Sequence, residues 1–464
     1  MPAVAAFGPP VRRRGGRRIL IALVLIALIA GLGIVYLNLA ATAAVNATGI
    51  LTVYQDSASL AHSSNPSFEA AKTGAVVQAG DSLKTDVKGR AAITLPDGTI
   101  TRLASDTTLT LDSAHFAKDG NLSDVKLTQQ LGRTFTNVRR LVSGATFKVA
   151  GKSATATVRG TQFEVYTKAD GSMTVKLFEG QLDFETARGG KYHLVAPQQI
   201  SIDANGVVKG PEPLQPDPAD PFGPALAAST SVAEGTTPGT EQDFIGKPLH
   251  DGEQQQYTYS YAGGSLVKAS LGYPGSAMRL TVQTPSGDKF IGTGTSPIVV
   301  TVNNAPTGIY KIFVDGVSGL GAAGEEPFVA VASVESCTTA DIDQNGAVHR
   351  GYMAADLVQA VQVSGLSNLQ LKVGADSTSG AIIGGSGTYN GVNWAGSVVL
   401  VAHNGALDIT PVGGTVFGLS VPAQQLVQQI ATAIGQNPSN VSPGFMVDRL
   451  FTCKSVIVVD GRHA

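Results

Sequence analysis

The feature that most constrains this chain is an uncharged apolar run of 19 residues near its N-terminus, Ile19 to Leu37. As an α-helix with a rise of about 1.5 Å per residue, the run spans nearly the whole hydrocarbon core of a bilayer, which is about 30 Å thick. Five arginines precede it: Arg12, Arg13, Arg14, Arg17 and Arg18. Because such residues stay on the cytoplasmic side, we expect a basic cytoplasmic tail (1–18), a single transmembrane helix (19–40) and an extracytoplasmic remainder.

A cleaved signal peptide is the alternative interpretation of this segment. Ala41, Thr42 and Ala43 form an A-x-A pattern of the kind that signal peptidases cut. The apolar region of a signal peptide is usually about 7–15 residues long, which is shorter than the run observed. We therefore favour an anchor, with the cytoplasmic membrane as a partner through residues 19–40.

The charge distribution argues against a nucleic-acid partner. Without the five N-terminal arginines, the chain retains 28 of its 33 basic residues against 35 acidic residues, a net charge of −7. Phosphate recognition requires an excess of positive charge. The extracytoplasmic region is therefore not expected to bind nucleic acid.

Turn dipeptides and alternating side chains predict a mainly β fold. Six Asp-Gly and four Asn-Gly pairs follow the membrane segment, and such pairs favour the positive φ angles of tight hairpin turns. Between them, Phe163 and Val165 alternate with Glu164 and Tyr166. Alternation with a period of two is typical of strands with one buried face.

A proline-rich stretch divides this region into domains. Residues 209–240 contain seven prolines with Ala, Ser and Thr between them, so we expect an extended linker. It separates a β domain at 48–208 from a β-sandwich of about seven or eight strands at 241–335.

The last segment, 336–464, is expected to be an α+β domain. Helical spacing of apolar residues predicts helices over Tyr352–Val363 and Val421–Ile434. Strand-like runs lie between them, at Gly396–Ala402 and Ala406–Thr410.

The first β domain carries an ordered set of motifs. They are Gly74–Asp81, Gly89-Arg90-Ala91, Leu95–Thr99, Thr157–Val165 and Glu179-Gly180. Over residues of about 70–200 this set resembles the FecR domain, the extracytoplasmic module of transmembrane regulators in iron–siderophore signalling. The resemblance implies a twisted, solenoid-like β domain. It implies structural turns at Gly80, Asp81, Asp97, Gly98, Gly160 and Thr161, with ligand contacts at these residues as the alternative.

The chain departs from those regulators in two respects. In them, an inner domain of several dozen residues binds a sigma factor, whereas 17 or 18 residues precede the apolar run here. A proline-rich stretch also replaces the signalling subdomain that follows their FecR domain. We therefore expect any regulation of a sigma factor or kinase to use a partner membrane protein.

Weaker resemblances concern the other two domains. Residues 241–335 resemble the bacterial pre-peptidase C-terminal sandwich, through motifs such as Tyr257-Thr258-Tyr259 and Leu280–Gly287. The resemblance implies a non-catalytic module that binds saccharide or protein. The pattern of 336–464 is compatible with a lipid-binding envelope fold.

Two cysteines, Cys337 and Cys453, are expected outside the cytoplasm. An even number in an oxidising compartment favours a disulfide, with two buried free thiols as the alternative. The 116-position separation would close nearly the whole terminal domain.

One segment resembles half of a calcium loop. Asp341, Asp343 and Asn345 occupy its first, third and fifth positions, and Gly346 provides the turn. The twelfth position, which should be a bidentate acid, is Tyr352. An Asx-rich turn is the alternative, and no other metal site, catalytic residue or cofactor is predicted.

These observations favour a non-catalytic, single-pass envelope protein that binds or senses an extracytoplasmic ligand, a glycan or a surface protein. One alternative is a FecR-type signal transducer that regulates a sigma factor. Another is an envelope protein that binds lipid through its C-terminal domain.

Overall fold

A computed structural model provides the structure of the protein for most of the chain beyond residue 44. The described residues are 45–46, 48–116, 122–139, 144–158, 160–215, 217, 223–261, 266–275, 277–320, 324–360, 366–389, 391–416, 419–421 and 441–463. The expected tail (1–18) and membrane helix (19–40) lie outside these ranges. Among the described residues, no helix is both long and apolar enough to cross a membrane.

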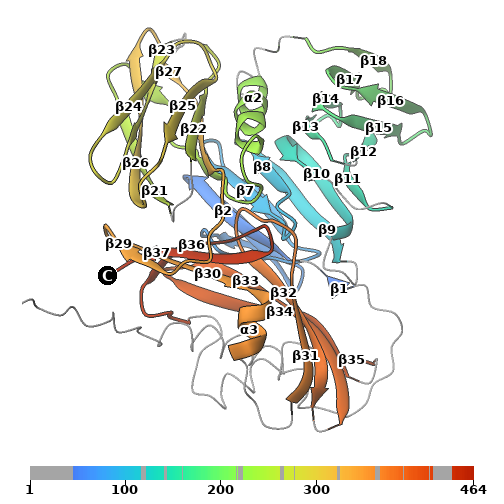
Figure 1. Cartoon of the computed structure of the whole chain (residues 1–464). Coiled ribbons are helices and arrows are strands. Elements are labelled where there is room, and N and C mark those ends of the chain that lie inside the picture. The colour runs from blue at the N-terminus through green and yellow to red at the C-terminus, as the bar shows by residue number, and fades with distance from the viewer. Residues whose placement is uncertain are drawn as a thin grey trace, which may run out of the picture.

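Three β-rich parts pack against one another (Figure 1). The first is built from strands β1–β18, the second from β19–β28 and the third from β29–β37. Helices are few, so the prediction of a mainly β fold is confirmed.

The first part is a closed barrel whose ladders form two sheets. One sheet contains β1 (Val45–Asn46), β3 (Ala58–His62), β4 (Asn65–Ala70), β6 (Ser82–Thr85), β9 (Thr108–Phe116), β11 (Thr146–Ala150), β12 (Ala154–Val158), β15 (Gln181–Thr186) and β16 (Lys191–Val195). The other contains β2 (Gly49–Gln55), β5 (Val76–Val77), β7 (Arg90–Thr94), β8 (Ile100–Leu103), β13 (Gln162–Thr167), β14 (Met173–Glu179), β17 (Gln198–Ile202) and β18 (Val208–Pro213).

The long strand β10 (Leu122–Asn137) joins these two sheets. Residues 122–131 pair with β9 and β11, and residues 132–137 pair with β8 and β13. At the switch, Gly132 has a φ of +88°, and a Cβ there would lie 2.5 Å from Thr107 Cα. The buried amide of Gln129 donates to the carbonyls of Gly132 (2.7 Å) and Val165 (3.0 Å). Because one strand serves both sheets, the ladders close into a barrel, whereas the resemblance implies a twisted, solenoid-like domain.

The proline-rich stretch 209–240 is not the extended linker that we expected. Its start belongs to β18, and helix α2 (Gly223–Glu234) occupies its centre. Proline is tolerated in the first turn of a helix, where Pro224 lies, and an alanine-rich run follows. The helix packs closely on β22, since a Cβ at Gly272 would lie 2.6 Å from the Ala225 carbonyl oxygen. Its Thr230 Oγ1 also donates to the barrel residue Gln162 (3.1 Å).

The second part is a β-sandwich, as its residue pattern predicts. One sheet has the order β19 (Gln242–Phe244), β28 (Val329–Val334), β22 (Leu266–Gly272) and β25 (Ile298–Asn303). The other has the order β21 (Gln254–Tyr261), β26 (Gly308–Ser318), β23 (Ala277–Gln283) and β24 (Lys289–Thr293). A small pair, β20 (Leu249–His250) with β27 (Glu325–Glu326), lies beside them.

The third part contains two more sheets and a short helix. One sheet has the order β29 (Ile342–Gln344), β30 (Ala347–Met353), β37 (Val456–Arg462) and β36 (Met446–Cys453). The other has the order β31 (Leu366–Val373), β32 (Ala381–Tyr389), β33 (Val392–His403), β34 (Ala406–Val416) and β35 (Leu419–Val421). Helix α3 (Ala354–Ala360) begins two residues after the expected start of the first helix. The second expected helix lies outside the described residues, except for Val421, which ends β35.

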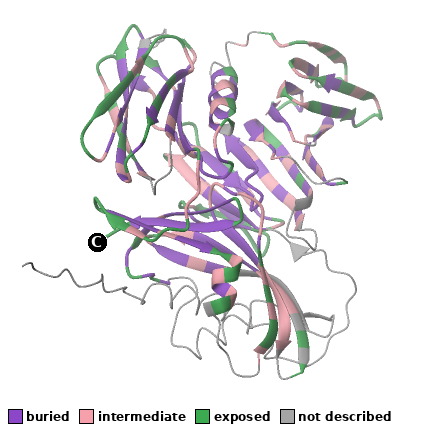
Figure 2. Ribbon diagram, in the orientation of Figure 1, coloured by how far each residue is buried: buried purple, intermediate pink, exposed green. Residues whose placement is uncertain are grey.

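Buried residues continue across the places where these parts meet (Figure 2). The barrel core includes Ile382, Val399 and Val401 from the third part. A second apolar cluster joins Phe135 of the barrel, Leu226 of α2 and Val331 of the sandwich. These shared cores hold the described parts in contact.

Candidate functional site

The family-like turns have structural partners in the barrel. The Asp81 carboxylate is 2 % exposed and accepts from the backbone N–H groups of Gln78 (2.9 Å) and Ser63 (3.0 Å). Its neighbour Gly80 has a φ of +91°. Gly160 also has a positive φ, and the Thr161 carbonyl accepts from Val138 N–H (2.8 Å). These contacts are consistent with turns at Gly80, Asp81 and Gly160, whereas Thr161 serves a contact with the segment that follows β10.

The Asp97-Gly98 turn lies where the barrel meets the third part. Asp97 accepts from Thr99 through the backbone N–H (3.0 Å) and the hydroxyl (2.9 Å). Burial raises the pKa of Asp97 to about 6, and the bonds from Thr99 oppose the rise. Gly98 has a φ of +85°, and a Cβ there would lie 2.7 Å from the Asp376 carbonyl oxygen. Burial also raises the pKa of Asp376, so two acids with raised pKa values lie at one contact between parts.

Two ion pairs, one of them fully buried, join the barrel to the sandwich side of the molecule. Arg102 on β8 lies 2.5 Å from Asp243 on β19, and their side chains are 6 % and 4 % exposed. The Tyr54 hydroxyl donates to the same carboxylate (3.2 Å), and burial holds the pKa of Tyr54 well above its usual value. Arg139, just after β10, pairs with Glu241. The contact between the two parts therefore depends on charge as well as on apolar packing.

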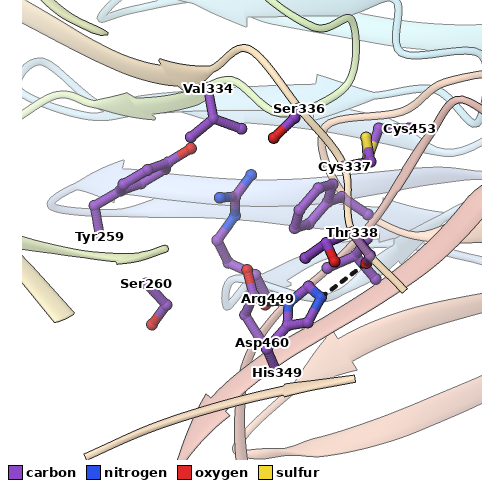
Figure 3. A pocket seen from close by; sticks show the side chains of 12 residues that line it. Tyr259, Ser260, Val334, Ser336, Cys337, Thr338, His349, Arg449, Cys453 and Asp460 are labelled. Atoms are coloured by element: carbon purple, nitrogen blue, oxygen red, sulfur yellow. Dashed lines mark hydrogen bonds and ion pairs between the residues drawn. A yellow bond between two sulfur atoms is a disulfide. The ribbon is translucent and has the colours of Figure 1, made fainter. Parts of the chain in front are cut away.

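A small cavity, the junction cavity, lies between the sandwich and the third part (Figure 3). Tyr259 of β21 and Ser336 line it from one side, and His349 of β30 with Arg449 and Cys453 of β36 line it from the other. Its volume is about 20 Å³, close to the space that one water molecule needs. Tyr259 is buried, and desolvation raises the pKa of its hydroxyl.

His349 and Asp460 form a buried pair at one end of this cavity. His349 Nδ1 lies 2.6 Å from Asp460 Oδ1, and its Nε2 lies 3.0 Å from the Thr338 carbonyl oxygen. A carbonyl oxygen only accepts hydrogen bonds, so Nε2 donates its proton to Thr338. Since Nε2 is engaged in this way, the pair does not activate a serine hydroxyl in the arrangement used by serine hydrolases.

The two cysteines are joined by a disulfide beside the cavity, with Cα atoms 6.2 Å apart. It connects the segment after β28 with β36. Cys453 is fully buried, and Cys337 is half-buried. The bond therefore links the end of the sandwich to the last hairpin of the chain.

The residues of the calcium-like segment lie at the β29–β30 hairpin. Asn345 (φ +53°) and Gly346 (φ +76°) form the turn of the β29–β30 hairpin. Asp343 Oδ1 lies 2.7 Å from His463 Nε2, and the Asn345 amide donates to the Thr307 carbonyl (3.1 Å). No group of three or more His, Cys, Asp or Glu among the described residues is placed to hold a metal. Asn345 and Gly346 thus form a hairpin turn, and weak calcium binding by Asp341, Asp343 and Asn345 stays a prediction.

Sequence patterns do not single out the residues that connect the parts. Arg102 is one local exception, because it stands in a short strand of otherwise uncharged residues, Ile100–Leu103. Asp460 is another, because it directly follows the apolar run Val456–Val459. Asp243, His349 and Arg449 carry no comparable signal. Their partners lie 111 to 209 positions away along the chain.

Comparison with known proteins gives one family match and several similar solved structures. Residues 81–183 match the family described as FecR protein. A crystal structure of a candidate anti-sigma factor from Parabacteroides distasonis ATCC 8503 is 24 % identical, with a TM-score of 0.24, and the match covers 28 % of this chain and 57 % of that chain. A second structure with the same description has 22 % identity, the same TM-score and the same coverage. No curated protein matches this chain.

Proposed function

Because residues 81–183 form a FecR domain, we propose that this chain is a non-catalytic signal transducer of the FecR type. Its extracytoplasmic parts sense a ligand, a glycan or a surface protein, and its output reaches a sigma factor. The family match is the observation that carries the proposal. The chain as a whole is anchored in the cytoplasmic membrane by residues 19–40, with residues 1–18 inside.

The contacts of the FecR domain support a role in transmission. A ligand changes the state of a protein only through differential interactions with two arrangements. The barrel touches the sandwich through the buried Arg102–Asp243 pair and touches the third part at Gly98. A change in either neighbouring part would therefore alter the environment of the FecR domain directly.

The composition supports a partner other than nucleic acid. The extracytoplasmic region carries more acidic than basic residues, which disfavours binding to phosphate backbones. Regulation of transcription would then pass through a protein partner at or inside the membrane.

Comparison of transcripts in the native host tests the proposal. Cells that lack the chain are compared with cells that express the full chain at its normal abundance. We expect a defined set of transcripts, sharing one promoter type, to change on removal and to return on restoration. Identical transcript profiles in both strains, across conditions that alter the cell envelope, would contradict the proposal.

A further inference from the structure

Arg449 is a buried cation without a carboxylate partner among the described residues. The residue is 8 % exposed, and its Nη2 donates to the carbonyls of Thr240 (3.1 Å) and Glu241 (3.4 Å). Its guanidinium lies 4.3 Å from the Phe451 ring centroid and 5.2 Å from that of Tyr259. Its Nη1 is buried and has no hydrogen-bond partner. Carbonyls and ring faces offset part of the charge, but one donor is left unsatisfied.

The nearby acid is engaged elsewhere. Asp460 Oδ1 lies 2.6 Å from His349 Nδ1. Figure 3 shows the Arg449 guanidinium pointing away from this pair, toward Tyr259 and Ser336. Asp460 lies opposite Arg449 in the β36–β37 ladder, but its ion pair is with His349 and not with the guanidinium.

The junction cavity provides space next to this unsatisfied donor. Arg449 lines the cavity together with the neutral hydroxyls of Ser260, Ser336 and Tyr259. The paired His349 and Asp460 line its other end. A volume of about 20 Å³ admits one water molecule or one small ion and excludes organic anions. A buried positive charge facing a space of this size attracts a monatomic anion.

We propose that the junction cavity binds one halide ion of the size of chloride on Arg449 Nη1. The ion compensates the guanidinium at the boundary between the sandwich and the third part. Because the ion binds only when these two parts are packed together, halide stabilises the packed arrangement by mass action. This site is independent of the FecR domain and of the signalling role.

Thermal unfolding of the purified full chain in detergent micelles tests the site, with gluconate replaced by chloride at constant ionic strength. We expect the midpoint to rise by about 2 to 4 °C between about 5 and about 300 mM chloride. Arg449→Gln, which keeps a polar side chain and removes the charge, should lose this dependence. The matched control is Arg102→Gln: Arg102 is equally buried and has an unpartnered Nη1, but it is paired with Asp243. This variant should retain the dependence.

Two results would overturn the site. One is an unfolding midpoint that is the same in chloride and in gluconate. That result would mean that the cavity holds a bridging water molecule and no halide. The other concerns crystals of the unsubstituted chain grown with bromide, which serve even if Arg449→Gln does not fold. We expect an anomalous peak within hydrogen-bonding distance of Arg449 Nη1, and a map without such a peak would refute the assignment.

Discussion

Removing the carboxylate of Asp243 should weaken the contact between the FecR domain and the sandwich more than any exposed charge could. Arg102 and Asp243 lie 2.5 Å apart with side chains 6 % and 4 % exposed, so Asp243→Ala leaves a buried guanidinium without its counter-charge. Breaking a buried pair in this way costs about 3–5 kcal/mol. The variant also removes the acceptor of the Tyr54 hydroxyl.

Native-state hydrogen exchange measures this cost where it should appear. The amides of β19 and α2 report the opening of the contact between barrel and sandwich. Asp243→Ala should lower their opening free energy by about 3 kcal/mol or more, whereas Arg102→Met with Asp243→Leu should be nearly neutral because no charge is left unpaired.

The matched control is the exposed pair Lys126–Asp112, at 3.1 Å with side chains 47 % and 27 % exposed. Lys126→Met should change stability by less than about 1 kcal/mol. If Asp243→Ala lowers the free energy by less than about 1 kcal/mol, as the control does, burial does not strengthen the Arg102–Asp243 pair and the reasoning is refuted.

Three further perturbations test other parts of the structure. Because the pKa of Asp97 is raised in the folded protein, the folded state holds this proton more tightly than the unfolded state does. The stabilisation from this proton is therefore fully present below pH 3.8 and is lost as the pH rises through about 6. The shift corresponds to about 3 kcal/mol; Asp97→Asn should remove this slope from urea unfolding between these pH values, and an unchanged slope would contradict it. Gly132→Ala should cost at least about 2 kcal/mol in chemical unfolding, because of its positive φ and the nearby Thr107 backbone. The control Gly189→Ala has a φ of +86° and open space around it, so it should cost only the conformational part, about 1–2 kcal/mol. Equal costs for the two glycine variants would show that crowding at the strand switch is unimportant. Replacing Cys337 and Cys453 by serine should lower the stability of the last part by about 2–5 kcal/mol in non-reducing buffer, and unfolding that is unchanged by the replacement and by reductant would contradict a stabilising disulfide.

Local patterns predicted the strands and turns because these depend on neighbouring residues. The strand at Phe163 and the turn at Asp97-Gly98 both appear in the structure, the latter with Gly98 at a φ of +85°. The predicted single buried face does not, because Glu164 is buried as well as Phe163 and Val165. The helix α2 was missed because the prolines of its surroundings outweighed its alanine-rich run. Its stability comes from packing on Gly272 and bonding to Gln162, which no local pattern contains.

The connecting residues could not be predicted because their partners are distant in sequence. Arg102 meets Asp243 across 141 positions, and Arg449 reaches Thr240 across 209 positions. Neither contact changes the periodicity of its own strand. The closed barrel also depends on contacts between strands that are distant in sequence, because β10 passes from one sheet to the other at Gly132.

Transcript profiles of interface variants in the native host test the central claim, that the FecR domain transmits a signal through its contact with the sandwich. The account predicts that Asp243→Ala, present in the membrane at normal abundance, changes the same transcripts as loss of the whole chain. It predicts that Arg102→Met with Asp243→Leu, which removes both charges, returns these transcripts toward their normal level. The contradicting result has two parts. Hydrogen exchange shows that Asp243→Ala opens the contact, yet cells with this variant have normal transcripts.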